Sequence, residues 1–276
     1  MIRAASSRAD FDACALIFNE VSLDHRVTGP ELADTIGDFL LHGDEGYAFA
    51  KASSVQGATY AMVRVRPAAR RRGVGSALLA AVRERSQPRM WGRVREDDPG
   101  SLAFATVQGL DEVSRDVTVV LQVAPGDGAQ RDDVVELREE HLAGAYAVVA
   151  EAMPETALPQ IAAAPPYEEW LGKERHAHRA VTFVALAGGE VVGYAGLTLL
   201  AGMPKRLENS LTAVKKSHRR RGIASALKRA EIAWAAEHGY TEIVTDMVEQ
   251  NTAMRAVNER LGYLPLPAWI VVEGSA

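Results

Sequence analysis

Residues 70–79 read RRRGVGSALL, and residues 219–228 read RRRGIASALK. Seven of these ten positions are identical in the two stretches. Their shared glycines, Gly73 and Gly222, lie 149 residues apart, which is the length of a domain and far longer than a solenoid unit. The chain is therefore predicted to contain two tandem copies of one fold.

The elements predicted around the two stretches follow a common order. Apolar, β-prone runs indicate strands, and apolar residues spaced three to four apart indicate helices. In the first copy we expect, in turn, a helix, a hairpin, a strand, a helix, a strand, a helix and a strand at 11–21, 39–53, 58–65, 73–87, 90–94, 101–107 and 113–121. In the second copy we expect a strand, two helices, a hairpin, a strand, a helix, a strand and a helix at 134–137, 139–153, 167–175, 181–200, 207–214, 222–238, 242–248 and 251–261. Each copy is predicted to be α+β, with a mixed, mostly antiparallel sheet flanked by helices.

A stretch rich in glycine and proline separates the copies. Residues 124–130 read APGDGAQ and follow a strand-like run. Such a composition is typical of a linker. We therefore expect an N-terminal domain at 1–124 and a C-terminal domain at 131–276.

Composition narrows the function classes. The 276 residues carry 31 Lys+Arg against 36 Asp+Glu, a net charge of −5, which argues against a nucleic-acid partner. With Cys14 as the single cysteine, no internal disulfide and no multi-thiolate metal site can form. Neither a signal segment nor an apolar run of about 20 residues is present, so no membrane partner is expected. These features indicate a cytoplasmic enzyme or binding protein without a metal.

The repeated motif can bind a diphosphate. In each copy a strand leads through Arg-x-x-Gly-x-(Gly/Ala) into a helix. The first N–H groups of a helix lack internal partners and carry partial positive charge, and a glycine lets an anion approach them. The dinucleotide fingerprint fails because position 78 is Leu78 rather than glycine or alanine. A phosphate-binding Gly-x4-Gly-Lys-(Ser/Thr) loop is also missing from the sequence.

What remains closely resembles the GNAT superfamily of acyl-CoA-dependent N-acetyltransferases. The resemblance rests on VRPAARRRGVG from Val65, on VKKSHRRRGIA from Val214, and on NTAMRAVNERLGY from Asn251. It covers essentially the whole chain as two copies, in the manner of two-domain bacterial acetyltransferases of the mycothiol-synthase type. It implies two tandem GNAT domains that use acetyl-CoA as co-substrate.

The resemblance also implies which residues bind the cofactor. Loop N–H groups would hold the pyrophosphate of CoA, and the strand before the loop would run along the pantetheine arm. The residues implied in the second copy are Thr212, Ala213, Val214, Arg219, Arg220, Arg221, Gly222, Ile223, Ala224 and Ser225. Those implied in the first copy are Val65, Arg70, Arg71, Arg72, Gly73, Val74, Gly75 and Ser76.

Three residues of the second copy are implied in catalysis. Glu208 lies fourteen residues before Gly222, where histone-type members carry the general base, whereas the same count from Gly73 reaches Thr59. Asn251 would approach the pantetheine or the leaving sulfur. Asn258 stands where many members carry a tyrosine that protonates the thiolate, so the proton donor stays open. This asymmetry predicts that the second copy is catalytic and the first degenerate or limited to CoA binding.

Two function classes follow. The first is an N-acetyltransferase acting on the primary amine of a small molecule, and the alternative is a non-catalytic acyl-CoA sensor or partner protein. His176 and His178 could form a metal pair or line an acceptor site, but the sequence offers no further ligand set, so we expect no metal. The chain is expected to be a monomer, with its copies as a pseudo-dimer, or a homodimer.

Overall fold

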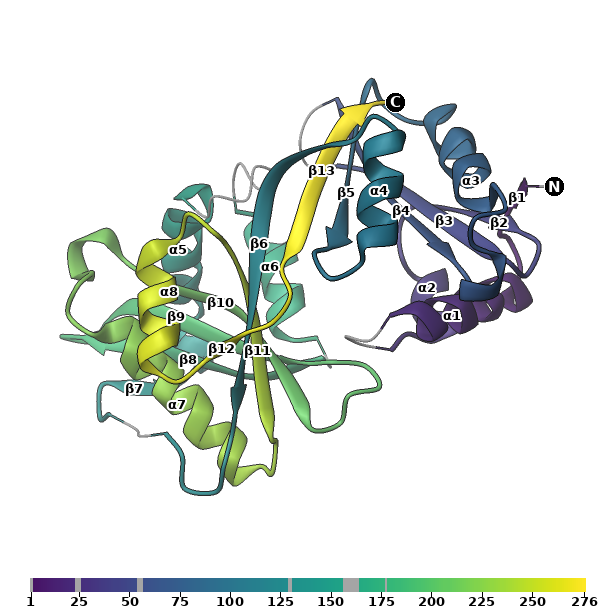
Figure 1. The fold of residues 1–276 in the computed structure, drawn as a ribbon. Helices are drawn as coiled ribbons and strands as arrows, with labels where there is room; N and C mark the ends of the chain where they lie inside the picture. The colour runs from purple at the N-terminus through teal and green to yellow at the C-terminus, as the bar shows by residue number, and fades with distance from the viewer. Residues whose placement is uncertain (1, 23–25, 54–56, 129–130, 156–163, 177) are drawn as a thin grey trace. The chain divides into compact units, whose positions relative to one another are not determined.

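The computed structural model describes residues 2–22, 26–53, 57–128, 131–155, 164–176 and 178–276 (Figure 1). Contacts divide the chain into two compact units. Unit 1 comprises Met1–Asp116 and Pro267–Ala276, and unit 2 comprises Val117–Leu266. Strand β6 (Asp111–Gln122) passes from the first unit into the second.

Unit 1 is a sheet with helices on both faces. Its order is β1-β2-β3-β4-β5-β13-β6. β4 and β5 are parallel, whereas β1–β2, β2–β3, β3–β4, β5–β13 and β13–β6 are antiparallel. The strands are β1 (Ile2–Ala4), β2 (Asp38–His42), β3 (Gly46–Ala52), β4 (Ala58–Val65), β5 (Arg89–Arg95) and β13 (Trp269–Ser275). The helices are α1 (Arg8–Val21), α2 (Gly29–Ala33), α3 (Val74–Arg83) and α4 (Pro99–Val107), with a 3₁₀ turn η1 (Pro67–Ala69).

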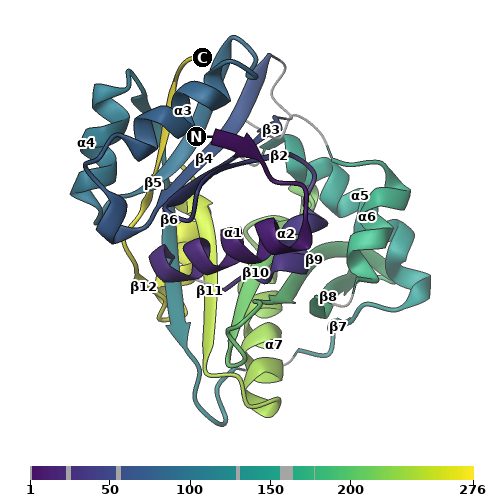
Figure 2. The ribbon, with the colours of Figure 1, turned by 90° about the vertical axis from the view of Figure 1, so that its right-hand side faces the viewer.

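The alternation of side chains along the strands gives unit 1 two cores. Phe39, Leu41 and Tyr47 pack under α1, whereas Leu40 and Ala48, one residue out of phase with them, pack under α3. Figures 1 and 2 show α1 and α2 on one face of this sheet and α3 and α4 on the other. The sheet is therefore the wall between the two helix layers.

Unit 2 repeats this plan. Its order is β6-β11-β10-β9-β8-β7, with β12 also paired to β6, and β10 and β11 are parallel. The strands are β7 (Val134–Glu136), β8 (Arg179–Ala187), β9 (Glu190–Leu199), β10 (Arg206–Val214), β11 (Glu242–Val248) and β12 (Leu264–Pro265). The helices are α5 (Leu142–Ala152), α6 (Tyr167–Glu174), α7 (Ile223–Glu237) and α8 (Thr252–Arg260), with 3₁₀ turns η2 (Glu139–His141), η3 (Met153–Glu155) and η4 (Lys216–His218).

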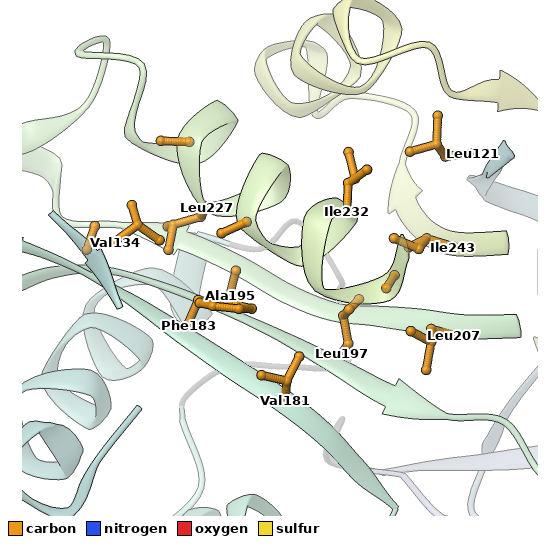
Figure 3. Close-up of a cluster of buried hydrophobic side chains, with 14 of the residues drawn as sticks. Leu121, Val134, Val181, Phe183, Ala195, Leu197, Leu207, Leu227, Ile232 and Ile243 are labelled. Atoms are coloured by element: carbon orange, nitrogen blue, oxygen red, sulfur yellow. The ribbon is translucent and has the colours of Figure 1, made fainter. Parts of the chain in front are cut away.

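Helix α7 covers the larger core of unit 2. Figure 3 shows Leu227 of α7 above Phe183, and Leu197 and Ile243 belong to the same buried cluster. On the opposite face α5 and α6 pack on a second cluster that includes Ala213. Both units thus have the predicted α+β architecture, and the predicted fold class is confirmed.

The units divide the chain elsewhere than at the predicted linker. The last strand, β13, lies between β5 and the first half of β6, and its pairing with β5 runs from Trp269↔Arg95 to Ser275↔Arg89. The second half of β6 instead pairs with β12 in unit 2. Strand pairing, which a linker-like composition does not encode, therefore places the boundary before residue 124 and assigns residues 267–276 to unit 1.

The element predictions agree well except at the ends. Strands β4 and β11 have the predicted bounds, but α3 ends at Arg83 rather than at residue 87. The short elements β1, α2 and β12 and the terminal strand β13 were not predicted. They are brief, or they depend on long-range pairing, which local periodicity does not reveal.

Candidate active site

The two repeated loops have the same backbone. Arg71 and Arg220 take φ values of 61° and 62°, and Gly73 and Gly222 take 84° and 78° as the N-caps of α3 and α7. A left-handed arginine is uncommon, so its occurrence at both matched positions marks one specific turn. A Cβ at either glycine would have no described atom within 4 Å, so the positive φ rather than crowding is what calls for glycine there.

An arginine attaches each loop to the strand before it. Arg70 Nε donates to the carbonyl oxygen of Val65 at 3.3 Å, and Arg219 Nε donates to that of Val214 at 3.1 Å. The same side-chain contact therefore ties each loop to the end of its strand. It places the first N–H groups of α3 and α7 at the end of a central strand, where they can bind an anion.

Beside each loop two parallel strands separate. β10 pairs with β11 from Arg206↔Glu242 to Glu208↔Val244 only, and β4 pairs with β5 over the matching three residues, 58–60. In β10 a bulge between Asn209 and Leu211 follows directly, whereas the β3–β4 register is regular. No further pairing of β10 with β11 or of β4 with β5 is found among the described residues, so the strand edge beside each loop is open to a chain-like ligand.

The register shows which backbone groups face this opening. Lys215 N–H donates to Val192 of β9, so in the antiparallel alternation the N–H and C=O of Val214 and Thr212 point away from β9. Val214 C=O accepts from Arg219 on that side. The N–H groups of Thr212 and Val214 are therefore directed to the side where β10 and β11 diverge.

A cavity of about 460 Å³ joins these features in unit 2. Most of the predicted cofactor residues line it, together with Asn251: Thr212, Ala213, Val214, Arg219, Arg220, Gly222, Ile223, Ala224 and Ser225. Arg221 does not line the cavity and instead donates to the Ser217 carbonyl. Arg260, which the sequence reasoning did not single out, adds a further cation at the wall.

Unit 1 has a matching cavity of about 530 Å³. Its lining includes the predicted residues Val65, Arg70, Arg71, Gly73, Gly75 and Ser76. Arg72 lies outside the lining and pairs with Glu45 at 3.0 Å, and Val74 is buried in the core under α3. Each repeat therefore forms its own cavity at its own loop.

Glu208 lies near the cavity of unit 2 but does not line it. Its neighbours Leu207 and Asn209 point into the α7 side of the sheet, so Glu208 points to the opposite face. The strand registers also correct the prediction, made by counting back from the loop glycines, that Thr59 is the counterpart of Glu208 in unit 1. Because the bulge adds Ser210 to β10 alone, Glu208↔Val244 corresponds to Tyr60↔Trp91, and the equivalent residue is Tyr60.

The two predicted asparagines have different surroundings. Asn251 caps α8, accepting from Met254 N at 3.2 Å, and lines the cavity. Asn258 is the buried residue of that helix, where its Nδ2 lies 3.6 Å from Met247 Sδ and its Oδ1 has no hydrogen bond to any described residue. Asn251 therefore faces the cavity, whereas Asn258 does not line it.

A buried polar cluster supports the bulge. Asn209 donates to Glu231 at 2.7 Å and accepts from Lys228 at 2.8 Å and from Thr212 at 3.0 Å. Burial raises the pKa of the Glu231 carboxyl and lowers that of the Lys228 ammonium. The equivalent positions in unit 1 are apolar: Ala61, Leu79 and Val82. The change from Leu79 to Lys228 was visible between the aligned motifs, but the sequence reasoning missed its meaning.

A second buried carboxylate lies on the other face of unit 2. Glu174 accepts from Arg179, Thr182 and Tyr194, each at 2.6–2.8 Å. His176 and His178 stack nearby with ring centroids 4.9 Å apart. Within the described ranges, no three His, Cys, Asp or Glu side chains gather as a metal site would require. Nor does that part of the chain contain a helix long and apolar enough to cross a bilayer.

Comparisons with known proteins agree with this geometry. The sequence model of the Acetyltransferase (GNAT) family matches residues 39–110 and 145–263, which is more than half of the chain and covers both loops. The protein therefore belongs to the GNAT acetyltransferase family. No curated protein sequence matches it closely enough to add a relative.

Solved structures share the fold over the whole chain. A tandem GNAT protein from the clavulanic acid biosynthesis pathway is 20% identical, with a TM-score of 0.80 over 100% of this chain and 98% of that one. A GCN5-related N-acetyltransferase from Sphaerobacter thermophilus is 17% identical, with a TM-score of 0.73 over 100% and 95%. A GNAT-family acetyltransferase from Colwellia psychrerythraea is 13% identical, with a TM-score of 0.67 over 100% of both. The predicted tandem arrangement is thereby confirmed.

Proposed function

We propose that the protein is an N-acetyltransferase whose unit 2 transfers an acetyl group from acetyl-CoA to the primary amine of a small molecule. The observation that carries the proposal is the unit 2 cavity, where a helix N-terminus, arginines and a strand edge meet. The helix N-terminus suits a diphosphate, and the arginines suit an additional phosphate group. The strand edge suits an amide-containing arm that pairs with it like an added strand.

The reaction assigned to this site is a direct attack. The neutral amine nitrogen bonds to the thioester carbonyl carbon, and the ammonium proton of the resulting intermediate passes to Glu208 through water. The carbon–sulfur bond then breaks, and CoA leaves as its thiolate. The N–H of Val214 would stabilise the oxygen that gains negative charge in the tetrahedral intermediate. Asn251 would lie beside the pantetheine arm or the departing sulfur.

Unit 1 is the second candidate, as an acyl-CoA-binding copy without turnover. Its loop and cavity have the same form, but Tyr60 stands where unit 2 carries Glu208. Tyr60 packs against Phe49 and Trp91, and a phenol is a poor base at neutral pH. Thr59, the position reached by counting, is buried and accepts from Gln87 N–H.

Calorimetric titration with acetyl-CoA tests both assignments. Gly222→Glu should remove the unit 2 site, and Gly73→Glu should remove the unit 1 site. Gly188→Glu and Gly43→Glu are matched controls, because both glycines have positive φ and open surroundings in the β8–β9 and β2–β3 turns. If acetyl-CoA does not bind, or if the control variants lose binding equally, the proposal fails.

Turnover separates the enzyme from the sensor. Release of the CoA thiol is followed with a panel of primary amines. Glu208→Gln should lower turnover and leave acetyl-CoA binding unchanged. Unchanged turnover would refute Glu208 as the base, and thiol release with none of the amines would favour the sensor.

A further inference from the structure

Most lining positions of the two cavities correspond, but the inner walls differ. Val21 at the end of α1 corresponds to Ala152 at the end of α5, and the strand walls are Val63–Val65 and Thr212–Val214. Within these walls Arg64 takes the place of Ala213, as their pairing with Tyr47 and Tyr194 shows. Unit 1 therefore has a guanidinium where unit 2 has a methyl group.

Arg64 lies on the face of the sheet opposite the loop. Its guanidinium stands 5.4 Å from the ring centre of Phe18 in α1, and it lines the unit 1 cavity. The Gly73 loop enters α3 on the other face. A ligand that extends from the loop between β4 and β5 would thus bring its far end to Arg64.

Arg64 has no acidic partner among the residues that the structure describes. Nearby Arg66 and Arg72 are paired with Glu20 and Glu45, but the Nε of Arg64 is buried without a hydrogen bond. Asp98 also lines the cavity, and it is engaged with Ser101 at the N-cap of α4.

Tyr47, which pairs with Arg64 across β3 and β4, gives a second and independent indication of a ligand here. Tyr47 is 0% exposed, and its hydroxyl forms no hydrogen bond within the described part of the chain. Its counterpart Tyr194 donates to Glu174 at 2.6 Å. Buried polar groups normally have hydrogen-bond partners. In unit 2 the carboxylate of Glu174 is that partner, whereas in unit 1 the Tyr47 hydroxyl and the Arg64 guanidinium are donors that a ligand carboxylate could satisfy.

We propose that the unit 1 cavity binds an acyl-CoA whose acyl group ends in a carboxylate, and that Arg64 binds this carboxylate. The inference rests on the proposed binding of CoA at the Gly73 loop. We assign a short dicarboxylic acyl group, because Arg64 belongs to the same strand segment, Val63–Val65, that would run along the pantetheine arm. A planar guanidinium pairs with a carboxylate through two charge-assisted hydrogen bonds.

The test compares CoA, acetyl-CoA, malonyl-CoA and succinyl-CoA by calorimetry in the full-length Gly222→Glu protein. Malonyl-CoA or succinyl-CoA should bind unit 1 at least about tenfold more tightly than acetyl-CoA, the ratio expected for one charge-assisted pair. Arg64→Ala, which installs the residue of unit 2, should abolish this preference and leave CoA binding unchanged. Arg64→Gln, which keeps a polar side chain with the same stem to Cδ but removes the charge, should do the same.

The outcomes are distinguishable. Equal binding of the four ligands, or a preference that survives in both Arg64 variants, overturns the inference while the CoA site stands. If Gly73→Glu changes nothing because CoA does not bind unit 1, the proposed CoA site fails and the inference fails with it. Melting temperatures of the Arg64 variants show whether a lost preference reflects loss of the fold.

Discussion

The side-chain amide of Asn209 donates hydrogen bonds to both carboxylate oxygens of Glu231, at 2.7 and 2.9 Å. Asn209 also accepts from Lys228, and all three side chains are at most 5% exposed. They form a closed polar cluster directly under the β10 bulge, and Thr212 of the cavity wall is bonded to it. The cluster therefore links α7 to the strand edge that faces the candidate active site.

Removing one charge from this cluster should be costly. Glu231→Val leaves Lys228 buried without its counter-charge, and we expect unit 2 to lose about 3–5 kcal/mol of unfolding free energy. The triple variant Asn209→Ala, Lys228→Leu, Glu231→Val installs the residues of unit 1 and should recover most of that loss. Urea unfolding of the wild type, Glu231→Val and the triple variant measures both the loss and the recovery of unfolding free energy. A triple variant no more stable than the single one would show that the cluster holds unit 2 together in a way apolar packing cannot replace.

The same cluster predicts a pH dependence. The pKa of Glu231 is raised in the folded protein above its ordinary value of 4.5 because the carboxyl is buried. Between pH 4.5 and the folded pKa, the folded state binds the proton that the unfolded state has released, so the contribution of Glu231 to stability falls as pH rises. The stability of the wild type relative to Glu231→Gln should therefore decrease from pH 4.5 to pH 7. Parallel urea-unfolding profiles over this range would contradict the assignment.

Local motifs in the sequence predict the fold and the loops, whereas buried hydrogen-bond partners and strand register are not predicted. The repeat at Gly73 and Gly222 predicts the fold, the two loops and the strand edge, because a local motif in strand–helix context fixes local geometry. The cluster around Asn209 was out of reach, since apolar periodicity marks a buried face but not the polar groups that satisfy one another on it. The bulge at Ser210 was also hidden, and it shifted the count that paired Glu208 with Thr59.

The matched tyrosines give a direct comparison between the units. Tyr194→Phe removes a hydrogen bond to buried Glu174 and should cost about 1–3 kcal/mol. Tyr47→Phe removes a buried hydroxyl that has no hydrogen bond among the described residues, so its effect should be close to zero or stabilising. Chemical unfolding of both variants without ligand measures the difference. Equal losses would mean that the Tyr47 hydroxyl is satisfied in solution, which would weaken the argument for a ligand beside Arg64.

The division of the chain can be tested by fragments. The fragment 117–266 keeps the part of β6 that pairs with β12, whereas the fragment 131–276, bounded by the predicted linker, loses it and carries β13 without β5. Buried residues of β13, such as Ile270 and Val272, would then be exposed. We expect 117–266 to be monodisperse, to unfold cooperatively and to bind acetyl-CoA. The fragment 131–276 should aggregate or unfold at lower denaturant.

Size-exclusion chromatography, circular dichroism and calorimetry distinguish these fragments, and the chain without residues 267–276 is the complementary control. Its unit 1 should be destabilised, because β13 pairs with both β5 and β6, while acetyl-CoA binding at the Gly222 loop should persist. The opposite pattern, with 131–276 stable and 117–266 unfolded, would restore the linker at 124–130 as the true boundary. It would also mean that β13 completes the second copy rather than the first.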